Sequence, residues 1–387
     1  MGRIVIAGGG IMGSCAAYHL ARAGAAADVV VVEPDPTYEF AATPRATGGI
    51  RMQHGVRENV EMSLYGDRVF SDFANQVSGG KVEFDPQFHR IGLLYLVSDS
   101  ESVTALERVS AMQAGLGVEV HILDRATLEA RYPSFNFDGV VAASFTPADG
   151  QIDPNAALMG FRRAAEGLGI TYLKDRVVGL EVADGLVRAA RLESGTMLPV
   201  DTFLNAANCW APEICARVGM KVPTAPMRRQ QFFFDTRTPL ETIPAMRFMD
   251  GLSFRPLQRS YLIGYTRFDE PRGFNWTLEE SMFDEFLWPQ LAERSKAFEA
   301  VKVKSGYVGH YDMNDFDANA IFGRWSKLPN FIIAAGFSGH GLQHSPAMGR
   351  AVKELIIDGG YQSIDLSRLS YRRVEENAPL LDEGMKA

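Results

Sequence analysis

The positions of apolar and glycine residues give the start of the chain a regular pattern. Residues 3–7 (RIVIA) and 28–32 (DVVVV) are almost entirely apolar, as strands buried on both faces are. Between them, three glycines precede a stretch over 11–23 with helical spacing of apolar residues, and Gly24 ends it. This order predicts a strand, a tight turn, a helix and a second, parallel strand, which form a βαβ unit.

The turn of this unit carries glycines in the register of a dinucleotide-binding motif. Gly8, Gly10 and Gly13 follow the pattern G-x-G-x-x-G: the first permits the sharp turn, the second lets a pyrophosphate approach, and the third lets helix and strand pack. Glu33 follows the second strand, where a carboxylate accepts hydrogen bonds from a ribose. Such glycines also occur in purely structural turns, but the whole order favours FAD or NAD.

The pattern of apolar and aromatic residues changes near residue 227. Before it, amphipathic stretches predict helices over 56–77, 101–114, 124–131 and 154–167, and apolar runs predict strands over 91–97, 139–145, 170–173, 177–182, 187–192 and 203–207. We expect the last four strands to extend the N-terminal sheet. From residue 227, alternating aromatic segments over 230–234, 246–254 and 261–265 predict an antiparallel sheet.

The C-terminal third returns to the earlier pattern. Residues 277–298 are helical in spacing, with a kink expected at Trp288-Pro289. Residues 331–344 predict a buried strand, a glycine turn and a helix that runs to about residue 358, and we expect the last 20 residues to be weakly ordered. The fold class is therefore α/β (α+β overall), a Rossmann-type nucleotide-binding domain (1–80, 145–215 and 306–387) interrupted by a substrate-binding domain with a mainly antiparallel sheet (81–144 and 216–305).

Composition excludes several classes of partner. Among 387 residues, 39 basic and 47 acidic side chains give a net charge of −8 without a basic block, so nucleic acid and anionic membranes are poor partners. No apolar run approaches the roughly 18 residues of a transmembrane segment. Cys15, Cys209 and Cys215 form no C-x-x-C pair and suit a reducing compartment. We expect a cytoplasmic protein without a bound metal.

A second glycine turn lies far along the chain. Gly336, Gly339 and Gly341 follow an apolar strand and precede a helix, which again places bare backbone amides at a helix N-terminus. Polar atoms of a flavin ring can accept hydrogen bonds there, whereas NAD needs no such second turn. A simple strand-to-helix turn is the alternative.

Six segments resemble a known family and run in its order through nearly the whole chain. The sequence is similar to the D-amino-acid oxidase superfamily of FAD enzymes, and within it to the sarcosine oxidase and dimethylglycine dehydrogenase branch. The segments are IVIAGGGIMG (4–13), TGGIR (47–51), DGQIDP (149–154), FLNAANCWA (203–211), GHYDMND (309–315) and AAGFSGHG (334–341). In the fourth segment, Asn208 stands where the family usually has glycine.

The resemblance implies a cofactor site spread over the chain. The ADP part of FAD is expected on the first glycine turn and Glu33, and the isoalloxazine ring on the second turn. The residues that the resemblance assigns to FAD are Gly8, Gly10, Ile11, Met12, Gly13, Glu33, Pro34, Arg45, Thr47, Gly48, Val178, Ala207, Trp210, Gly339, His340, Gly341, Leu342 and Gln343.

Substrates of this family are usually amines that bear a carboxylate, and such a ligand needs a cation, best a bidentate guanidinium. Arg51, in the Gly-Gly-Ile-Arg segment, is the first candidate for this role, and Arg255 is the second; a structural salt bridge is the alternative for each. Tyr311 resembles the active-site tyrosine of the family, although a packing role is equally consistent. His54 is a weaker candidate beside Arg51. We expect His340 to act through its backbone and not as a base.

Three departures from the resembling enzymes change the expected chemistry. Gly309 and Arg45 stand where relatives carry flavin-linking cysteine or histidine, so FAD should be non-covalent. Gln343 replaces a lysine of the carboxylate site. Leu262 replaces the lysine that activates oxygen, which leaves open whether oxygen or another acceptor takes the electrons.

The expected function is oxidation of the C–N bond of a secondary amine or amino acid by hydride transfer to FAD, giving an imine that hydrolyses. The expected partners are this small substrate and a protein or small-molecule electron acceptor. Two alternatives remain from the residues themselves: an FAD-dependent 2-hydroxy-acid dehydrogenase, whose substrate Arg51 would also bind, and a non-catalytic flavoprotein assembly factor or subunit.

Overall fold

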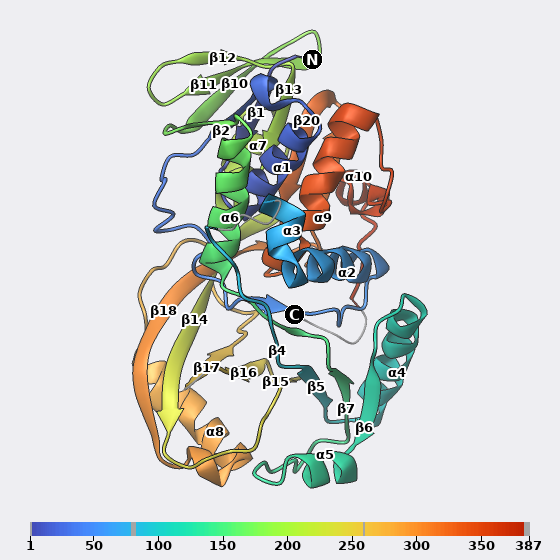
Figure 1. The fold of residues 1–387 in the computed structure, drawn as a ribbon, viewed down its shortest axis with the longest axis vertical. Coiled ribbons are helices and arrows are strands. Elements are labelled where there is room, and N and C mark those ends of the chain that lie inside the picture. The colour runs from blue at the N-terminus through green and yellow to red at the C-terminus, as the bar shows by residue number, and fades with distance from the viewer. Residues whose placement is uncertain (1, 79–82, 258–259, 383–387) are drawn as a thin grey trace.

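A six-stranded sheet forms the upper half of the molecule (Figure 1). The computed structural model describes residues 2–78, 83–257 and 260–382. Each neighbouring pair whose register is given is parallel, except the pair of β19 with β20. The strand order is β19 (Ile321–Trp325), β20 (Leu328–Ala335), β13 (Thr202–Asn205), β1 (Ile4–Ala7), β2 (Val29–Val32) and β9 (Thr171–Leu173).

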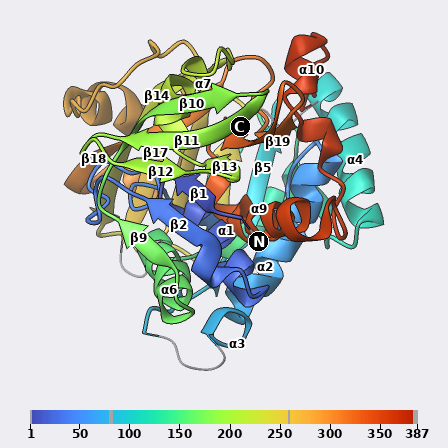
Figure 2. The ribbon, with the colours of Figure 1, turned by 90° about the horizontal axis from the view of Figure 1, so that it is seen from above.

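The strands of this sheet are apolar at every position because both faces are covered. In β1, Ile4 and Ile6 belong to a core formed with helices, whereas Val5 and Ala7 belong to a second core on the opposite face. The second core is closed by α7 (Ala211–Ala216) and a three-stranded sheet of β10 (Val177–Ala183), β11 (Leu186–Leu192) and β12 (Met197–Pro199), which Figure 2 shows from above. The expected α/β class with a Rossmann-type sheet is confirmed.

The expectation that residues 177–182 and 187–192 extend the six-stranded sheet was wrong. They form β10 and β11, which pair with each other antiparallel in a separate sheet. Asp184 and Gly185 connect them, both with positive φ (53° and 68°), as a two-residue hairpin turn requires. Because that turn returns the chain directly onto itself, β10 pairs within the hairpin.

The lower half of the molecule is built on an eight-stranded sheet, antiparallel except where β15 pairs with β5 (Figure 1). Its strands come from residues 93–146 and 224–314; the domain boundaries given above remain predictions. The order is β18 (Val301–Asn314), β14 (Thr224–Thr236), β17 (Tyr261–Tyr265), β16 (Leu252–Pro256), β15 (Ala245–Phe248), β5 (Leu93–Val97), β7 (Ala142–Thr146) and β6 (His121–Asp124). A small sheet of β3 (Gly49–Ile50), β8 (Gly150–Gln151) and β4 (His89–Arg90) lies between the halves.

Local capping explains where several helices begin. The side chains of Asp99, Asp124 and Asp153 accept backbone N–H bonds at the starts of α4 (Ser100–Gly115), α5 (Arg125–Arg131) and α6 (Pro154–Gly167). Other α-helices are α2 (Arg57–Ser71), α3 (Phe73–Ser78), α8 (Trp288–Arg294), α9 (Gly341–Lys353) and α10 (Arg372–Glu375), and α1 is described below.

Two expected helices differ from prediction. The stretch 56–77 is divided into α2 and α3 at Asp72, which leaves the helical region (φ −135°, ψ 43°). The stretch 277–298 is helical only from residue 281 to residue 294 and again over 296–298. Pro289 lies in the first turn of α8, after a π-helical turn over Phe283–Leu287, which is where a missing backbone N–H is tolerated.

The prediction of a weakly ordered C-terminal tail was wrong for residues 368–382. The buried carboxylate of Asp317 pairs with Arg373 (2.7 Å) and accepts a hydrogen bond from the backbone N–H of Leu380 (3.0 Å). The Asp382 carboxylate then accepts from the backbone N–H of Gly55 (2.9 Å). These two carboxylates, Asp317 and Asp382, thus attach the tail to the body; residues 383–387 lie outside the described residues.

Helices α1 (Ile11–Arg22) and α9 pack against each other on the same face of the six-stranded sheet. A Cβ on Gly349 of α9 would lie only 2.6 Å from the backbone carbonyl carbon of Cys15 in α1. No other residue fits at that distance, so glycine sets how closely the two helices approach.

No helix in the described part of the chain combines the length and the apolar character needed to cross a membrane.

The helix contact at Gly349 is testable. We expect Gly349→Ala to lower the free energy of unfolding by about 1–3 kcal/mol, because an added methyl group must push α1 and α9 apart. It should also weaken binding of the expected cofactor FAD, since α1 and α9 begin at the two glycine turns to which the resemblance assigns FAD. Thermal unfolding and fluorescence titration with FAD measure the two effects.

The matched control is Gly115→Ala at the end of α4, where a Cβ meets nothing within 4 Å. That variant should be neutral or stabilised by up to about 1 kcal/mol through helix propensity. Equal behaviour of the two variants would contradict the importance of the α1–α9 contact.

Candidate FAD site and adjoining arginine pocket

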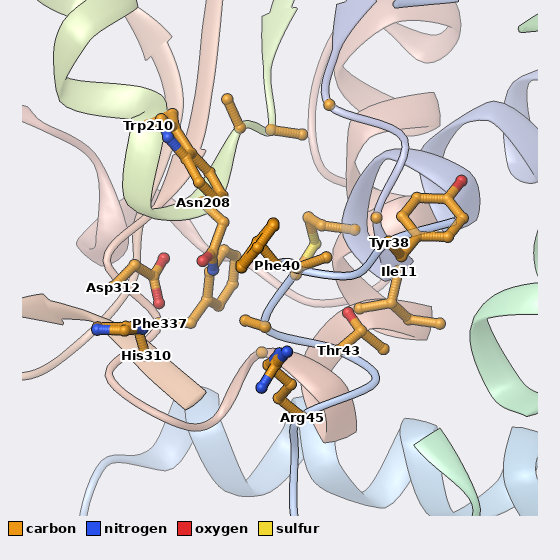
Figure 3. A pocket seen from close by; sticks show the side chains of 18 of the residues that line it. Ile11, Tyr38, Phe40, Thr43, Arg45, Asn208, Trp210, His310, Asp312 and Phe337 are labelled. Atoms are coloured by element: carbon orange, nitrogen blue, oxygen red, sulfur yellow. The ribbon is translucent and has the colours of Figure 1, made fainter. Parts of the chain in front are cut away.

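A cavity of about 560 Å³, here called the main cavity, extends between the ends of β1 and β2 and the N-terminus of α9. Figure 3 shows it from close by, with Trp210 and Asn208 on one side, Ile11, Tyr38 and Thr43 on the other, and Phe40 between them. The residues lining it come from segments as far apart as Ala7 and Leu342. It is therefore a product of tertiary folding.

The first glycine turn, residues 8–13, forms one end of the main cavity and is called the proximal cradle. Gly8 has φ +98°, and a Cβ on it would lie 2.6 Å from the carbonyl oxygen of Ala206. A Cβ on Gly13 would lie 1.9 Å from the carbonyl oxygen of Gly8, so helix and turn pack in direct contact. Gly10 precedes α1 without a side-chain cap, which leaves the first backbone N–H groups of the helix available to an anion.

Glu33 holds this cradle in place. Its carboxylate accepts hydrogen bonds from the backbone N–H groups of Gly9 (2.7 Å) and Asp35 (2.9 Å). Burial raises the pKa of Glu33, and those two hydrogen bonds oppose the rise. The carboxylate lines the main cavity, as a ribose-binding acid at the end of β2 must.

The second glycine turn, residues 336–341, forms the other end and is called the distal cradle. Gly339 has φ +94°, and a Cβ there would lie 2.5 Å from Cζ of Tyr311. The Asp312 carboxylate accepts from the backbone N–H of Gly336 (2.8 Å), and burial raises its pKa to about 6. The cap of α9, His340, makes no side-chain capping bond, so this helix N-terminus is also open to a ligand.

The structure brings most of the predicted cofactor residues to the main cavity. Gly13, Gly48 and Val178 do not line either cavity, whereas Arg176 and Val177 line the main one. Thr47, His340 and Gln343 line the smaller pocket described next. Those lining the main cavity are Gly8, Gly10, Ile11, Met12, Glu33, Pro34, Arg45, Ala207, Trp210, Gly339, Gly341 and Leu342.

Asn208 has a structural explanation that the sequence did not offer. Its φ is +51°, in the left-handed region that favours glycine and, next to it, asparagine. Asn208 therefore keeps the backbone conformation expected of a glycine. Its buried side-chain oxygen has no hydrogen-bond partner among the described residues, and Asn208 lines the main cavity.

A second pocket of about 80 Å³, here called the arginine pocket, adjoins the main cavity. Tyr311, Gly339 and Arg229 line both. The arginine pocket contains both predicted carboxylate-binding residues, Arg51 and Arg255. The structure thus places these candidates beside the distal cradle; His54, the weaker candidate, lies behind the pocket wall.

Arg51 is held by neutral partners. Its guanidinium donates to the backbone carbonyl of Gln53 and lies 2.9 Å from Nε2 of His340. Because a guanidinium can only donate, Nε2 of His340 is the acceptor and carries no proton. The backbone N–H of Arg51 donates to Oε1 of Gln343 (3.0 Å), and burial lowers the pKa of Arg51 to about 10.

Three histidines behind Arg51 are neutral. The rings of His54, His340 and His344 lie 5.0–5.7 Å apart. Burial, reinforced by the charge of Arg51, lowers the pKa of all three below its usual range. We expected His340 to act only through its backbone, but its imidazole also lines the arginine pocket and orients Arg51.

Arg255 and Tyr311 form the opposite wall. The Arg255 guanidinium donates to the carbonyl of Thr47 (3.3 Å) and lies against Gly49, whose absent side chain makes room for it. Burial raises the pKa of Tyr311, but the charges of Arg229, Arg247 and Arg255 outweigh it and lower the pKa overall. Tyr311 is therefore poised as a hydrogen-bond donor at the junction of the two cavities.

Arg229, Arg247, Gln231 and Asp149 line the arginine pocket but were not predicted. The alternation of side chains between the two faces of a strand could have indicated these residues. Phe232 and Phe234 of β14 lie in the apolar core, as Phe254 of β16 does, so the residues between them must face the other way. The polar residues on that face are Arg229 and Gln231 of β14, Ser253 and Arg255 of β16, and Arg247 of β15.

Asp149 is the one carboxyl group among the residues that line the arginine pocket. Its Oδ1 accepts from the backbone N–H of Met52 (2.9 Å), and its buried Oδ2 has no partner among the described residues. Burial raises its pKa to about 8, so the group is largely protonated at neutral pH. No group of three or more potential metal-binding side chains occurs in the described part of the chain.

The raised pKa of Asp149 predicts a pH dependence. Between pH 4 and 8 the native state holds this proton and the unfolded chain does not, so its contribution to stability falls as pH rises through that range. Asp149→Asn keeps the acceptor for Met52 and cannot ionise. From pH 5 to 8 its unfolding free energy should fall less than that of the wild type, by roughly 3 kcal/mol.

Chemical denaturation at several pH values, with FAD present, measures this difference. Asp184→Asn, at an exposed turn with φ +53°, is the control and should follow the wild type. Parallel curves for wild type and Asp149→Asn would show that Asp149 is ionised throughout.

Comparisons with known proteins agree with this geometry. The chain is 34% identical over 99% of its length, and 84% of the relative's, to FAD-dependent oxidoreductase domain-containing protein 1 of Xenopus laevis. It is 26% identical over 97% of its length to 4-methylaminobutanoate oxidase (formaldehyde-forming) of Paenarthrobacter nicotinovorans, of which it spans 46%. The crystal structure of L-proline dehydrogenase from P. horikoshii superimposes with a TM-score of 0.86 at 26% identity, covering 98% of this chain and 99% of that one.

Residues 3–355 match the family described as FAD dependent oxidoreductase (DAO). With two glycine cradles opening into one cavity and an acid at the end of β2, the chain belongs to this family of FAD-dependent oxidoreductases.

Proposed function

We propose that the protein oxidises the C–N bond of a secondary amine or amino acid that bears a carboxylate, giving an imine that hydrolyses. The observation that carries the proposal is that the arginine pocket, which contains Arg51, joins the main cavity at Tyr311 and Gly339. FAD, when bound, supplies the acceptor for the two electrons that the substrate loses. The chain itself must bind the carboxylate, orient the reacting carbon and control the proton on nitrogen.

Arg51 is proposed to hold the carboxylate. Its guanidinium is buried, and its hydrogen-bond partners within the described residues are neutral, so its charge is available to a ligand. The contact with Nε2 of His340 fixes the plane of the guanidinium beside the distal cradle. A pair of the buried Arg51 guanidinium with a substrate carboxylate would orient the substrate strongly, because little water competes for either group.

The surroundings favour a neutral amine. Four guanidinium groups line the arginine pocket. The one lining carboxyl group, Asp149, is mostly protonated at neutral pH. Positive neighbours disfavour a protonated nitrogen on the substrate. The buried imidazoles are poor proton acceptors, since their pKa values are lowered, so the substrate amine is proposed to leave its proton in water and to bind in its neutral form. Tyr311 is placed to hydrogen-bond the substrate.

FAD is proposed to be non-covalent. Gly309 and Arg45 lie in contact, with a Cβ on Gly309 only 3.1 Å from the carbonyl oxygen of Arg45, and both line the main cavity. Neither side chain can form the covalent link that the family makes at these positions. The electron acceptor remains open: Leu262 lines the arginine pocket and brings no cation, so a protein or small-molecule acceptor is as consistent as oxygen.

The reaction class is tested by mixing the purified yellow protein anaerobically with panels of N-methyl amino acids, D- and L-amino acids and 2-hydroxy acids. We expect the absorbance near roughly 450 nm, typical of oxidised flavins, to fall with at least one amine. Bleaching by hydroxy acids alone would show a 2-hydroxy-acid dehydrogenase. No bleaching by any compound would favour a structural role for FAD. Comparing reoxidation by air and by a dye then identifies the class of acceptor.

The carboxylate site is tested with Arg51→Met and Arg255→Met. We expect Arg51→Met to lower kcat/KM by about 100-fold, since a buried guanidinium–carboxylate pair contributes several kcal/mol, and Arg255→Met to have the smaller effect. Arg51→Lys should recover part of the loss. Arg125→Met on the exposed face of α5 is the control. A larger effect at Arg255 would assign the carboxylate to that residue.

A further inference from the structure

The arginine pocket holds more positive charge than one carboxylate can neutralise. Four guanidinium groups line a space of about 80 Å³: Arg51, Arg229, Arg247 and Arg255. Asp149 is the sole lining carboxyl group, and burial keeps most of it protonated at neutral pH. Asp382 acts on Arg51 and Arg247 from a distance but does not line the pocket. An excess of positive charge remains after Asp382 is counted.

None of the four guanidinium groups forms an ion pair within 4.0 Å with any carboxylate that the structure describes. Arg229 donates to the backbone carbonyl of Tyr265 (2.7 Å) and the hydroxyl of Thr266 (2.8 Å), and its buried Nε has no partner within the same residues. The neighbouring Arg228, on the opposite face of β14, pairs with Glu270 (2.6 Å) and Glu279 (2.7 Å). The chain therefore compensates one arginine fully and leaves the adjacent one open to the pocket.

Among the four arginines, Arg247 is the one whose guanidinium is most available to bind a ligand. Its guanidinium makes no hydrogen bond or ion pair to the described residues, yet its charge acts on Arg51, Arg255 and Tyr311. Burial, followed by this repulsion from Arg247, lowers the pKa of both Arg51 and Arg255 to about 10. Such a cluster costs free energy unless an anion enters it.

The arrangement separates two binding positions. Arg51 contacts His340 beside the distal cradle. Arg247 on β15 and Arg255 on β16 lie on adjacent strands, since Arg247 pairs in register with Ser253, two residues from Arg255. We propose that the substrate is a small amino acid with two carboxylates, one bound by Arg51 and the second by Arg247 and Arg255. This proposal rests on the amine oxidation proposed above.

The first test measures binding of unreactive acids to the FAD-loaded protein. Glutarate carries two carboxylates, and glutaramate has the same shape with one of them replaced by an amide. We expect glutarate to bind at least 10-fold more tightly, measured by calorimetry at matched ionic strength and by perturbation of the flavin spectrum. Equal affinity for the two compounds would overturn the proposal.

Variants locate the second position. Arg247→Gln should reduce the glutarate preference to less than 3-fold, and Arg247→Lys, which keeps the charge, should restore part of it. The control Arg188→Gln removes an exposed arginine from the hairpin of β10 and β11 and should keep the full preference. A preference that survives Arg247→Gln unchanged, with the protein folded as judged by FAD content, would contradict the role of Arg247.

Reactivity separates this proposal from the function on which it rests. Anaerobic bleaching by N-methylglutamate should exceed that by N-methylglutamine at least 10-fold in kcat/KM. Equal bleaching by both, without a glutarate preference, would overturn the dicarboxylate proposal and leave amine oxidation standing. A glutarate preference without bleaching by any amine would overturn amine oxidation and leave the two-carboxylate site standing.

Discussion

The contact between α1 and α9 decides whether the protein has one cofactor site or two unrelated glycine turns. Each helix begins at a cradle, and the two helices approach so closely at Gly349 that a methyl group would meet the backbone of Cys15. Since the N-terminal ends of both helices then open toward the main cavity, their uncapped N–H groups and positive dipole ends act on the same ligand. A long nucleotide such as FAD can contact both cradles only because this packing sets their separation.

Electrostatics give the adjoining pocket its character. Arg51, Arg229 and Arg255 donate to backbone carbonyls, a hydroxyl and an imidazole, and burial keeps most of the lining acid protonated at neutral pH. The same burial keeps the three histidines uncharged. The result is a small space that attracts anions and disfavours protonated amines, and whose imidazole and carboxyl group are weak proton acceptors at neutral pH, which is consistent with the chemistry proposed above.

Local features of the site were predictable because they depend on neighbouring residues. The proximal cradle, Glu33 and the capped helices α4, α5 and α6 follow from motifs that span a few residues. Val178, which the resemblance assigned to FAD, does not line the main cavity, whereas its neighbour Val177 does; the assignment stays a prediction. Arg229 and Arg247 were missed because their importance depends on which face of a strand they occupy, although alternation with Phe232 and Phe234 contains that information.

The sequence by itself determined the βαβ unit, the two glycine turns and the membership of an FAD-binding family, because backbone conformation at glycine and the alternation of apolar residues act over short distances. The tertiary structure alone decided that the turns share a cavity and that arginines from β14, β15 and β16 converge beside Arg51. Strand register and helix packing join residues far apart in the chain, and no local pattern encodes those distances.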